Sequence, residues 1–335
     1  MQILVLGGTA WLGRTITATA LELGHEVTCL ARSASGAVPD GAGFVRADRD
    51  KPGAYDQVAE QRWDGVIDLT RQPGHARDAT EALAGTTDRW VLVSTGNVYR
   101  SHARLDDDET APTLDPLEAD AMESSDDYGP AKVACEQAVL DVLGDRAVIA
   151  RAGLIGGPGD ESGRSGYWPW RFAHPADDSG SVLVPASEIQ TSLIDVRDLA
   201  AWIVGAAAGE HATGVYDAVA NRMSLPDYLK VAREVAGHEG PTVPVTDAWL
   251  LEQGVAEWMG PKSLPGWIAD PDWRGFAAHQ GARIAANGLA PRPLAETLRD
   301  VLAWEEARPE PGPHGAGLSD EEEQALLAAA TAEVA

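Results

Sequence analysis

Tyr128 and Lys132 are the residues of this chain best suited to move a proton. They lie in the segment Asp127-Tyr128-Gly129-Pro130-Ala131-Lys132, and a spacing of four places both side chains on one face of a helix. A free tyrosine has a pKa of about 10, and a nearby ammonium stabilises the phenolate. Lys132 is therefore expected to lower the pKa of Tyr128 toward the range of general acid-base catalysis. The same spacing also occurs where an aromatic side chain only covers a solvated lysine. The surrounding elements must therefore show whether the pair is catalytic or structural.

The amino terminus supplies a nucleotide-binding pattern. Residues 2–6 form an apolar run typical of a buried strand, and a helix is expected over about 14–23. The turn between them reads Gly7-Gly8-Thr9-Ala10-Trp11-Leu12-Gly13. Such a turn lets backbone amides approach a pyrophosphate at the positive end of the helix dipole. The turn lacks the Lys-Ser/Thr ending of a Walker A loop, so the pattern favours a dinucleotide site formed by these seven residues.

The rest of the chain repeats the strand and helix rhythm. Strand-like runs are predicted at 26–31, 44–47, 65–69, 90–94 and 147–152. This alternation predicts an α/β fold with a doubly wound parallel sheet. A helix at 196–208 and a strand at 214–219 are expected to return to that sheet, which makes the second, smaller lobe discontinuous.

The predicted division gives residues 1–159 and 190–220 to the dinucleotide-binding domain. Residues 160–189 and 221–304 form the substrate-binding lobe, and 305–335 form a solvated linker and a helix opened by a capping box at 319–322. The lobe is rich in tryptophan and proline, which suits the lining of a cleft, although an ordinary core explains any single tryptophan equally well. Trp168 and Arg171 are the candidate substrate contacts in this lobe.

Composition narrows the classes of function. The 335 residues carry a formal charge of -26, which opposes nucleic-acid and anionic-membrane binding. The two cysteines, Cys29 and Cys135, give no disulfide framework and fit a reducing compartment. No run reaches transmembrane length and the first residues form a strand, so a cytoplasmic protein is expected. The histidines lack ligand spacing, so no metal is expected.

The motifs together resemble the extended or atypical short-chain dehydrogenase/reductases, also called NAD-dependent epimerase/dehydratases. The resemblance spans about residues 1–220 and rests on the glycine turn, Ser94-Thr95-Gly96-Asn97-Val98-Tyr99, the Tyr128/Lys132 pair and residues 151–160. It implies a Rossmann-type domain in which Thr95 holds the substrate oxygen and Tyr128 transfers the proton. It also implies that Lys132 binds the nicotinamide ribose, while the nicotinamide carries the hydride.

Several departures from the family pattern narrow the reaction. Ala10 replaces the middle glycine of the turn, as in atypical members, and no asparagine occurs between Thr70 and Val93. Nucleotide-sugar 4,6-dehydratases have Asp-Glu where Gly96 and Asn97 stand, so a dehydratase is disfavoured. Asn97 is a candidate substrate contact, although capping the strand end is its simpler role.

Two further positions bear on nucleotide-sugar epimerases. These relatives usually carry an asparagine after the sixth strand and an arginine before the Val-x-Asp segment, and Leu154 and Thr191 match those positions here. A diphosphate needs charge-assisted partners. The epimerase interpretation is therefore weakened unless Arg171, Arg197 or another basic residue substitutes.

Cofactor choice depends on the end of the second strand, which reads Leu30-Ala31-Arg32-Ser33. An acidic residue there would favour NAD(H), whereas Arg32 can pair with a 2'-phosphate, with Arg14 nearby, and favours NADP(H). NAD(H) stays possible because Arg32 can also be a solvated surface residue. Asp48 is a candidate adenine contact or a turn cap.

The sequence thus favours an NAD(P)-dependent reductase or dehydrogenase that acts on a carbonyl or alcohol of a small to medium substrate. A nucleotide-sugar epimerase using transient oxidation is the first alternative. A non-catalytic member that binds RNA is the second, opposed by the acidic charge. A homodimer through the catalytic helix is possible by resemblance alone.

Overall fold

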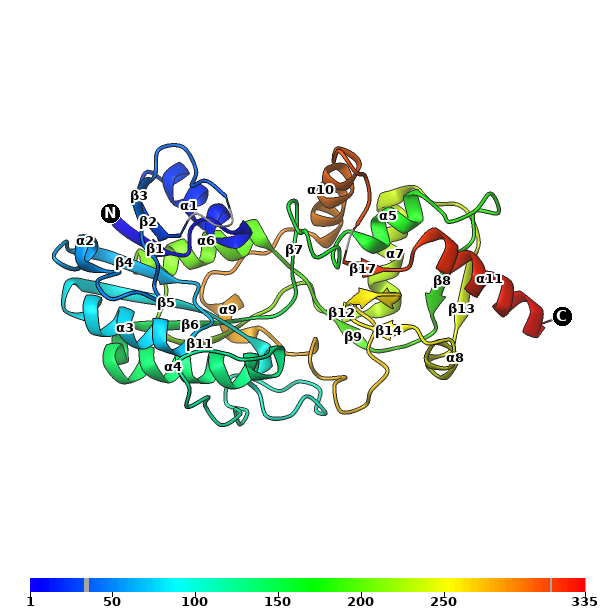
Figure 1. Ribbon diagram of the computed structural model, residues 1–335. Helices are drawn as coiled ribbons and strands as arrows, with labels where there is room; N and C mark the ends of the chain where they lie inside the picture. The colour runs from blue at the N-terminus through cyan, green and yellow to red at the C-terminus, as the bar shows by residue number, and fades with distance from the viewer. Residues whose placement is uncertain (33–35, 314, 335) are drawn as a thin grey trace.

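The computed structural model divides the chain into a large body built on a sheet and a smaller body (Figure 1). The structure describes residues 1–32, 36–313 and 315–334. Ser33, which follows Arg32 in the predicted cofactor segment, and His314 and Ala335 of the predicted tail lie outside the described residues.

The large body contains a sheet of seven parallel strands in the order β11-β6-β5-β4-β1-β2-β3. The strand order reverses between β1 and β4, and in a doubly wound sheet ligands bind in the crevice at this point. The predicted doubly wound fold is confirmed. The strands are β1 (Gln2–Leu6), β2 (Glu26–Ala31), β3 (Gly43–Arg46), β4 (Trp63–Asp68), β5 (Thr87–Thr95), β6 (Ala147–Ala152) and β11 (Gly214–Ala218).

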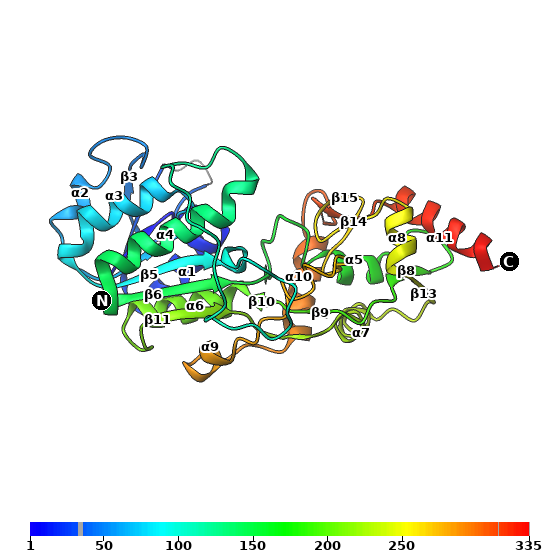
Figure 2. The ribbon, with the colours of Figure 1, turned by 90° about the horizontal axis from the view of Figure 1, so that it is seen from below.

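Helices cover both faces of this sheet (Figures 1 and 2). On one face α1 (Trp11–Glu22) packs beside α6 (Val196–Ala207), and on the other α3 (Pro73–Leu83) packs beside α4 (Tyr128–Leu143). The short α2 (Asp56–Ala59) lies next to α3. Because both faces are buried, the strands are almost continuously apolar. Alternate residues of β1 serve the two cores, with Ile3 in one and Leu4 in the other.

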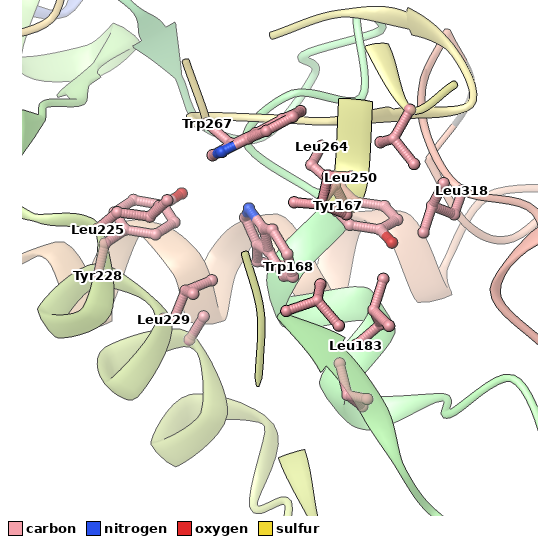
Figure 3. Close-up of a cluster of buried hydrophobic side chains, with 14 of the residues drawn as sticks. Tyr167, Trp168, Leu183, Leu225, Tyr228, Leu229, Leu250, Leu264, Trp267 and Leu318 are labelled. Atoms are coloured by element: carbon pink, nitrogen blue, oxygen red, sulfur yellow. The ribbon is translucent and has the colours of Figure 1, made fainter. Parts of the chain in front are cut away.

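The smaller body combines helices with short strand pairs. Its main core is drawn in Figure 3. Its helices are α5 (Tyr167–Ala173), α7 (Leu225–Ala236), α8 (Asp247–Glu252), α10 (Leu294–Glu306) and α11 (Asp320–Val334). Its strand pairs are β8 (Val182–Pro185) with β13 (Thr242–Val245), β9 (Gln190–Thr191) with β12 (Met223–Ser224), β14 (Ala256–Glu257) with β16 (Ser263–Leu264), and β15 (Gly260–Pro261) with β17 (Ala316–Gly317). The pair β7 (Ile155–Gly156) and β10 (Ile194–Asp195) lies where the chain passes between the bodies.

Two segments pack differently from the predicted division, which otherwise stays a prediction. Leu326 and Leu327 of α11 are buried in the core of the smaller body, so the end of the chain is part of that body. Ile284 of α9 (Ala282–Ala286) and Leu289 pack in the core of the large body. Both contacts join residues far apart in the chain, which local periodicity does not reveal.

The described residues include no helix with the length and apolar character needed to cross a membrane.

Two glycines allow α1 to begin directly against the end of β1. Gly7 has φ of +109°, a conformation that favours glycine. A Cβ on Gly13 would lie 2.3 Å from the carbonyl oxygen of Gly7. The helix can therefore approach the turn this closely only while position 13 has no side chain.

Gly13→Ala is expected to lower the free energy of unfolding by about 1–3 kcal/mol, because the added methyl forces the helix away from the turn. Urea unfolding followed by circular dichroism measures the change. The control is Gly85→Ala, since Gly85 is exposed and a Cβ there would meet nothing within 4 Å. Equal stability of the two variants would contradict this account of the turn.

Candidate active site

A cavity of about 900 Å³ lies at the carboxyl ends of the central strands, and residues of the smaller body also line it. The large body contributes Thr95, Asn97, Tyr128 and Lys132 to its lining. The structure thus brings together the residues expected to carry the chemistry, although they come from two separate segments.

Tyr128 is the first residue of α4, as Pro130 requires. Ser124 and Asp127 form a capping box in the preceding turn, in which the Asp127 carboxylate accepts from the backbone N–H of Ser124 at 3.0 Å. A Cβ on Gly129 would lie 2.5 Å from the Asn97 carbonyl oxygen. Glycine at 129 therefore lets the start of α4 approach the end of β5, and this brings Tyr128 to Thr95.

Thr95 and Asn97 are tied together at the end of β5. The Thr95 hydroxyl donates to Asn97 Oδ1 at 3.0 Å, and Thr95 Oγ1 accepts from the Asn97 backbone N–H at 3.2 Å. Thr95 also lies close enough to Tyr128 for its hydroxyl to act on the pKa of the phenol. Asn97 therefore caps the strand end while it lines the cavity, and its two expected roles occur together.

Tyr128 has a pKa raised above its usual value of about 10, because burial disfavours the phenolate. The Thr95 hydroxyl and the positive charges of Arg71 and Arg164 oppose this shift in the pKa. The expected lowering of the tyrosine pKa by Lys132 is wrong for this structure. The Lys132 ammonium donates to the backbone oxygens of Thr70 at 2.5 Å and Val93 at 2.6 Å, and its own pKa is lowered by burial.

A second groove, of about 460 Å³, lies along the glycine turn and shares Leu12, Thr70 and Arg71 with the main cavity. Ala10 precedes α1 and has no side-chain acceptor, which leaves the first-turn amides available to a phosphate. The groove therefore fits the pyrophosphate of a dinucleotide. Of the seven turn residues, five line it, namely Gly7, Thr9, Ala10, Leu12 and Gly13.

The other two residues of the turn lie elsewhere. A Cβ on Gly8 would lie 2.5 Å from Cys29 Sγ, so this glycine serves the packing of the turn on β2. The Trp11 indole lines the main cavity and donates to the Pro158 carbonyl oxygen at 2.9 Å. Trp11 thus connects the turn with the loop that follows β7.

At the far end of the groove Arg32 is largely exposed and lies 3.8 Å from the Asp50 carboxylate. Asp48, expected to contact adenine, does not line the groove. Its carboxylate accepts from the Asp50 backbone N–H at 3.2 Å and caps a turn. Arg49 and Asp50 line the groove in its place.

Trp168 and Arg171 do not line the cavity, so their expected substrate contacts are wrong. Trp168 is 1 % exposed in the centre of the smaller core (Figure 3), and its indole donates to the Pro265 carbonyl oxygen at 2.6 Å. Arg171 is 2 % exposed and pairs with Asp320 and Glu323 of α11, both at 2.7 Å. Both side chains face the interior because α5 packs between α7 and α10.

The arginines considered as substitutes in a nucleotide-sugar site are already engaged. Arg171 is paired as described, and Arg197 pairs with Asp195 and Asp300, both at 2.7 Å. Leu154 lines the cavity, whereas Thr191 is buried outside it.

Sequence reasoning missed Arg71 and Arg164, which both line the cavity. Arg71 follows the end of β4 by three residues and Arg164 lies in the loop after β7. Arg71 could have been identified from the sequence, because it lies just after the end of a predicted strand and ligands bind at the carboxyl ends of such strands. The described part of the chain contains no group of three His, Cys, Asp or Glu side chains that could hold a metal ion.

Aromatic side chains form one wall of the cavity. Trp258, Trp273 and Phe276 line it. His102 stacks on Trp273 with ring centres 4.7 Å apart and meets Phe276 edge-on at 5.1 Å. The expected tryptophan lining is therefore met by Trp258 and Trp273, which come late in the chain.

The order of the strands defines a Rossmann-type α/β fold, and the cavity lies at the carboxyl ends of its strands. The model of the NAD dependent epimerase/dehydratase family matches residues 3–218, and the chain belongs to this family. No curated protein matches the chain.

Solved structures share the fold at low sequence identity. A putative epimerase from Burkholderia cenocepacia is 22% identical, with a TM-score of 0.63, over 91% of this chain and 98% of that one. The UDP-Glc/GlcNAc 4-epimerase from Campylobacter jejuni is 14% identical, with a TM-score of 0.64, over 92% and 99%. A Thermus thermophilus UDP-glucose 4-epimerase in complex with NAD is 19% identical, with a TM-score of 0.61, over 92% and 100%.

The aromatic wall is expected to weaken in acid. Burial lowers the pKa of His102 from 6.5 to about 4, helped by the charge of His279. The unfolded chain therefore takes up a proton below pH 6.5 that the folded chain does not, and stability falls as the pH drops from 6.5 to about 4.

His102→Phe, which keeps the ring but cannot titrate, is expected to remove up to about 3 kcal/mol of this loss. Urea unfolding between pH 4 and 7 measures it. The control is the same substitution at the exposed His174. An unchanged pH dependence in His102→Phe would rule out the assignment.

Proposed function

We propose that this protein transfers a hydride between a nicotinamide cofactor and a carbonyl or alcohol of a small to medium substrate. The observation that carries the proposal is that Thr95 and Tyr128 line the same cavity, which runs into the glycine-turn groove. A bound nicotinamide supplies the hydride, which no side chain can provide.

The side chains supply orientation and the proton. Thr95 binds the substrate oxygen, and Tyr128 donates its proton to that oxygen when a carbonyl is reduced. The raised pKa of Tyr128 keeps the phenol protonated at neutral pH, which suits reduction. Lys132 uses two of its three donors on backbone oxygens, so the third remains available to a ribose hydroxyl.

Water elimination is not part of the proposal. A 4,6-dehydratase needs an acid and a base next to the threonine, and Gly96 and Asn97 occupy those positions. Neither side chain can donate and take up a proton at neutral pH.

An epimerase that oxidises and re-reduces one carbon is the second candidate. A cavity of about 900 Å³ has room for an intermediate to turn, and the solved structures of similar fold include UDP-sugar epimerases. Leu154, at the position of a sugar-nucleotide contact in such relatives, favours net redox instead, because its side chain cannot form a hydrogen bond. An epimerase consumes no net cofactor, whereas a reductase oxidises one reduced nicotinamide for each carbonyl.

Tyr128→Phe is expected to lower turnover by about 10²- to 10⁴-fold, because the substrate oxygen loses its proton donor. Oxidation of NADPH or NADH with a panel of ketones and aldehydes measures turnover, and calorimetry measures cofactor affinity, which is expected to stay unchanged. Tyr228→Phe removes the same atom from the smaller body and serves as the control. Full activity in Tyr128→Phe would exclude the mechanism.

NADP(H) is the proposed form of the cofactor, because Arg32 lines the far end of the groove and its guanidinium is largely exposed. The solved relatives named with a cofactor contain NAD, and Asp50 also lines the groove. Arg32→Ala is expected to weaken NADP⁺ binding about tenfold or more and to leave NAD⁺ binding unchanged.

Calorimetric titration of each nucleotide checks this preference, with Arg62→Ala, an exposed arginine paired with Asp88, as the control. An equal effect of Arg32→Ala on both nucleotides would show that Arg32 does not read the 2'-phosphate.

A further inference from the structure

The loop between β7 and α5 holds Arg164 at the cavity without neutralising it. The Asp160 carboxylate accepts from the hydroxyls of Ser162 at 2.6 Å and Ser165 at 2.7 Å, and from the backbone N–H of each. Arg164 Nε donates to Ser162 Oγ at 3.0 Å. Asp160 is therefore hydrogen-bonded to the two serines, and Ser162 in turn positions the arginine.

Among the described residues, neither terminal nitrogen of the Arg164 guanidinium has a hydrogen-bond partner and no carboxylate lies within 4.0 Å of it. Three arginines with largely buried side chains are each paired with a carboxylate: Arg49 with Asp68, Arg151 with Glu136 and Arg171 with Glu323. Arg164 itself is partly buried. Burial is the largest influence on its pKa and lowers it, while the charge of Asp160 opposes this shift. A cation that is partly removed from water without a paired carboxylate is costly, and such costs are typical of ligand sites.

A second cation lies at the same side of the cavity. Arg71 lines both the cavity and the groove, and no ion pair of Arg71 occurs within the described residues. The charges of Arg71 and Arg164 both act on the Tyr128 phenol. Two arginines thus place positive potential beside the oxygen that is proposed to transfer the proton.

The part of the lining that comes from the smaller body is largely apolar. Trp258, Met259 and Ile268 line it, together with the carboxylates Glu257 and Asp270. In the part of the chain that the structure covers, neither carboxylate lies within ion-pair distance of Arg164. The lining therefore combines two cations that act on Tyr128 with a mainly apolar surface from the smaller body.

We propose that the substrate carries a compact anionic group, a carboxylate or a phosphate, which binds Arg164 beside the Tyr128 hydroxyl while its apolar part lies against Trp258. The inference rests on the proposed hydride transfer and names the substrate class for it. The guanidinium offers a planar fork of donors that matches either anion. The anion lies near the reacting oxygen, which points to 2- or 3-oxo acids, the corresponding hydroxy acids, or phosphate esters of similar length.

Binding of inert anions tests this inference without any turnover. Phenylacetate and phenyl phosphate are titrated by calorimetry, with neutral phenylacetamide as the reference compound. At least one anion is expected to bind more tightly than phenylacetamide. Arg164→Met is expected to weaken the binding of that anion about 10- to 100-fold, because a charged hydrogen bond is lost. The stronger anion identifies whether the natural group is a carboxylate or a phosphate.

Two further variants test whether a loss of binding comes from misfolding. Arg164→Lys keeps the charge without the fork and is expected to bind with intermediate affinity, whereas Arg62→Met removes an exposed charge elsewhere and is expected to bind like the wild type. Circular dichroism confirms that each variant is folded.

Two results would overturn the inference. In the first, Arg164→Met leaves anion binding unchanged, as it would if the anion bound at the glycine turn. In the second, neither anion binds more tightly than phenylacetamide. Failure of the proposed function gives a different result. In that case Arg164→Met would still weaken anion binding. However, no carbonyl compound in the panel would give cofactor oxidation that is lost in Tyr128→Phe.

Discussion

The close approach of α4 to the end of β5 is the constraint on which the candidate site depends. A side chain at position 129 would collide with the carbonyl oxygen of Asn97, so glycine alone lets the first turn of the helix reach the strand. Tyr128 and Thr95 come from separate segments and meet only because of this contact. The backbone packing at Gly129 therefore holds the two residues near each other.

A buried polar network behind the strand end keeps that contact rigid. Ser94, next to Thr95, donates to Glu136 of α4 at 2.5 Å, and Arg151 of β6 pairs with the same carboxylate at 2.7 Å. Tyr99 donates to Asp217 of β11 at 2.6 Å and accepts from Arg151 at 3.0 Å. Buried polar groups are costly unless they are satisfied. Movement of β5 away from α4 would break these bonds, so the network favours one arrangement of the reacting residues.

The sequence predicted the sheet well because burial on both faces makes the central strands largely apolar runs, as in β1. The bounds of β1, β2 and β6 agree with the predicted ranges residue for residue. The glycine turn and the Tyr128 helix were also predictable, since Gly7, Gly13 and Pro130 act through local geometry. The roles of Trp168 and Arg171 were not. The partners of Arg171 on α11 lie about 150 positions away, and no local pattern says toward which body a short helix turns its side chains.

The same limit explains why Arg164 was missed and why it matters. An arginine in a glycine-rich loop has the same sequence pattern whether it is paired, solvated or left without a carboxylate. Only the complete set of neighbours distinguishes these cases, and here Asp160 is already used by two serines. The fold thus holds a cation in place before any ligand arrives, at a cost in free energy. An anion that binds there finds its partner already oriented, so little ordering free energy is lost on binding. This preorganisation is the advantage that the proposed anion site would gain from an arginine without a paired carboxylate near Tyr128.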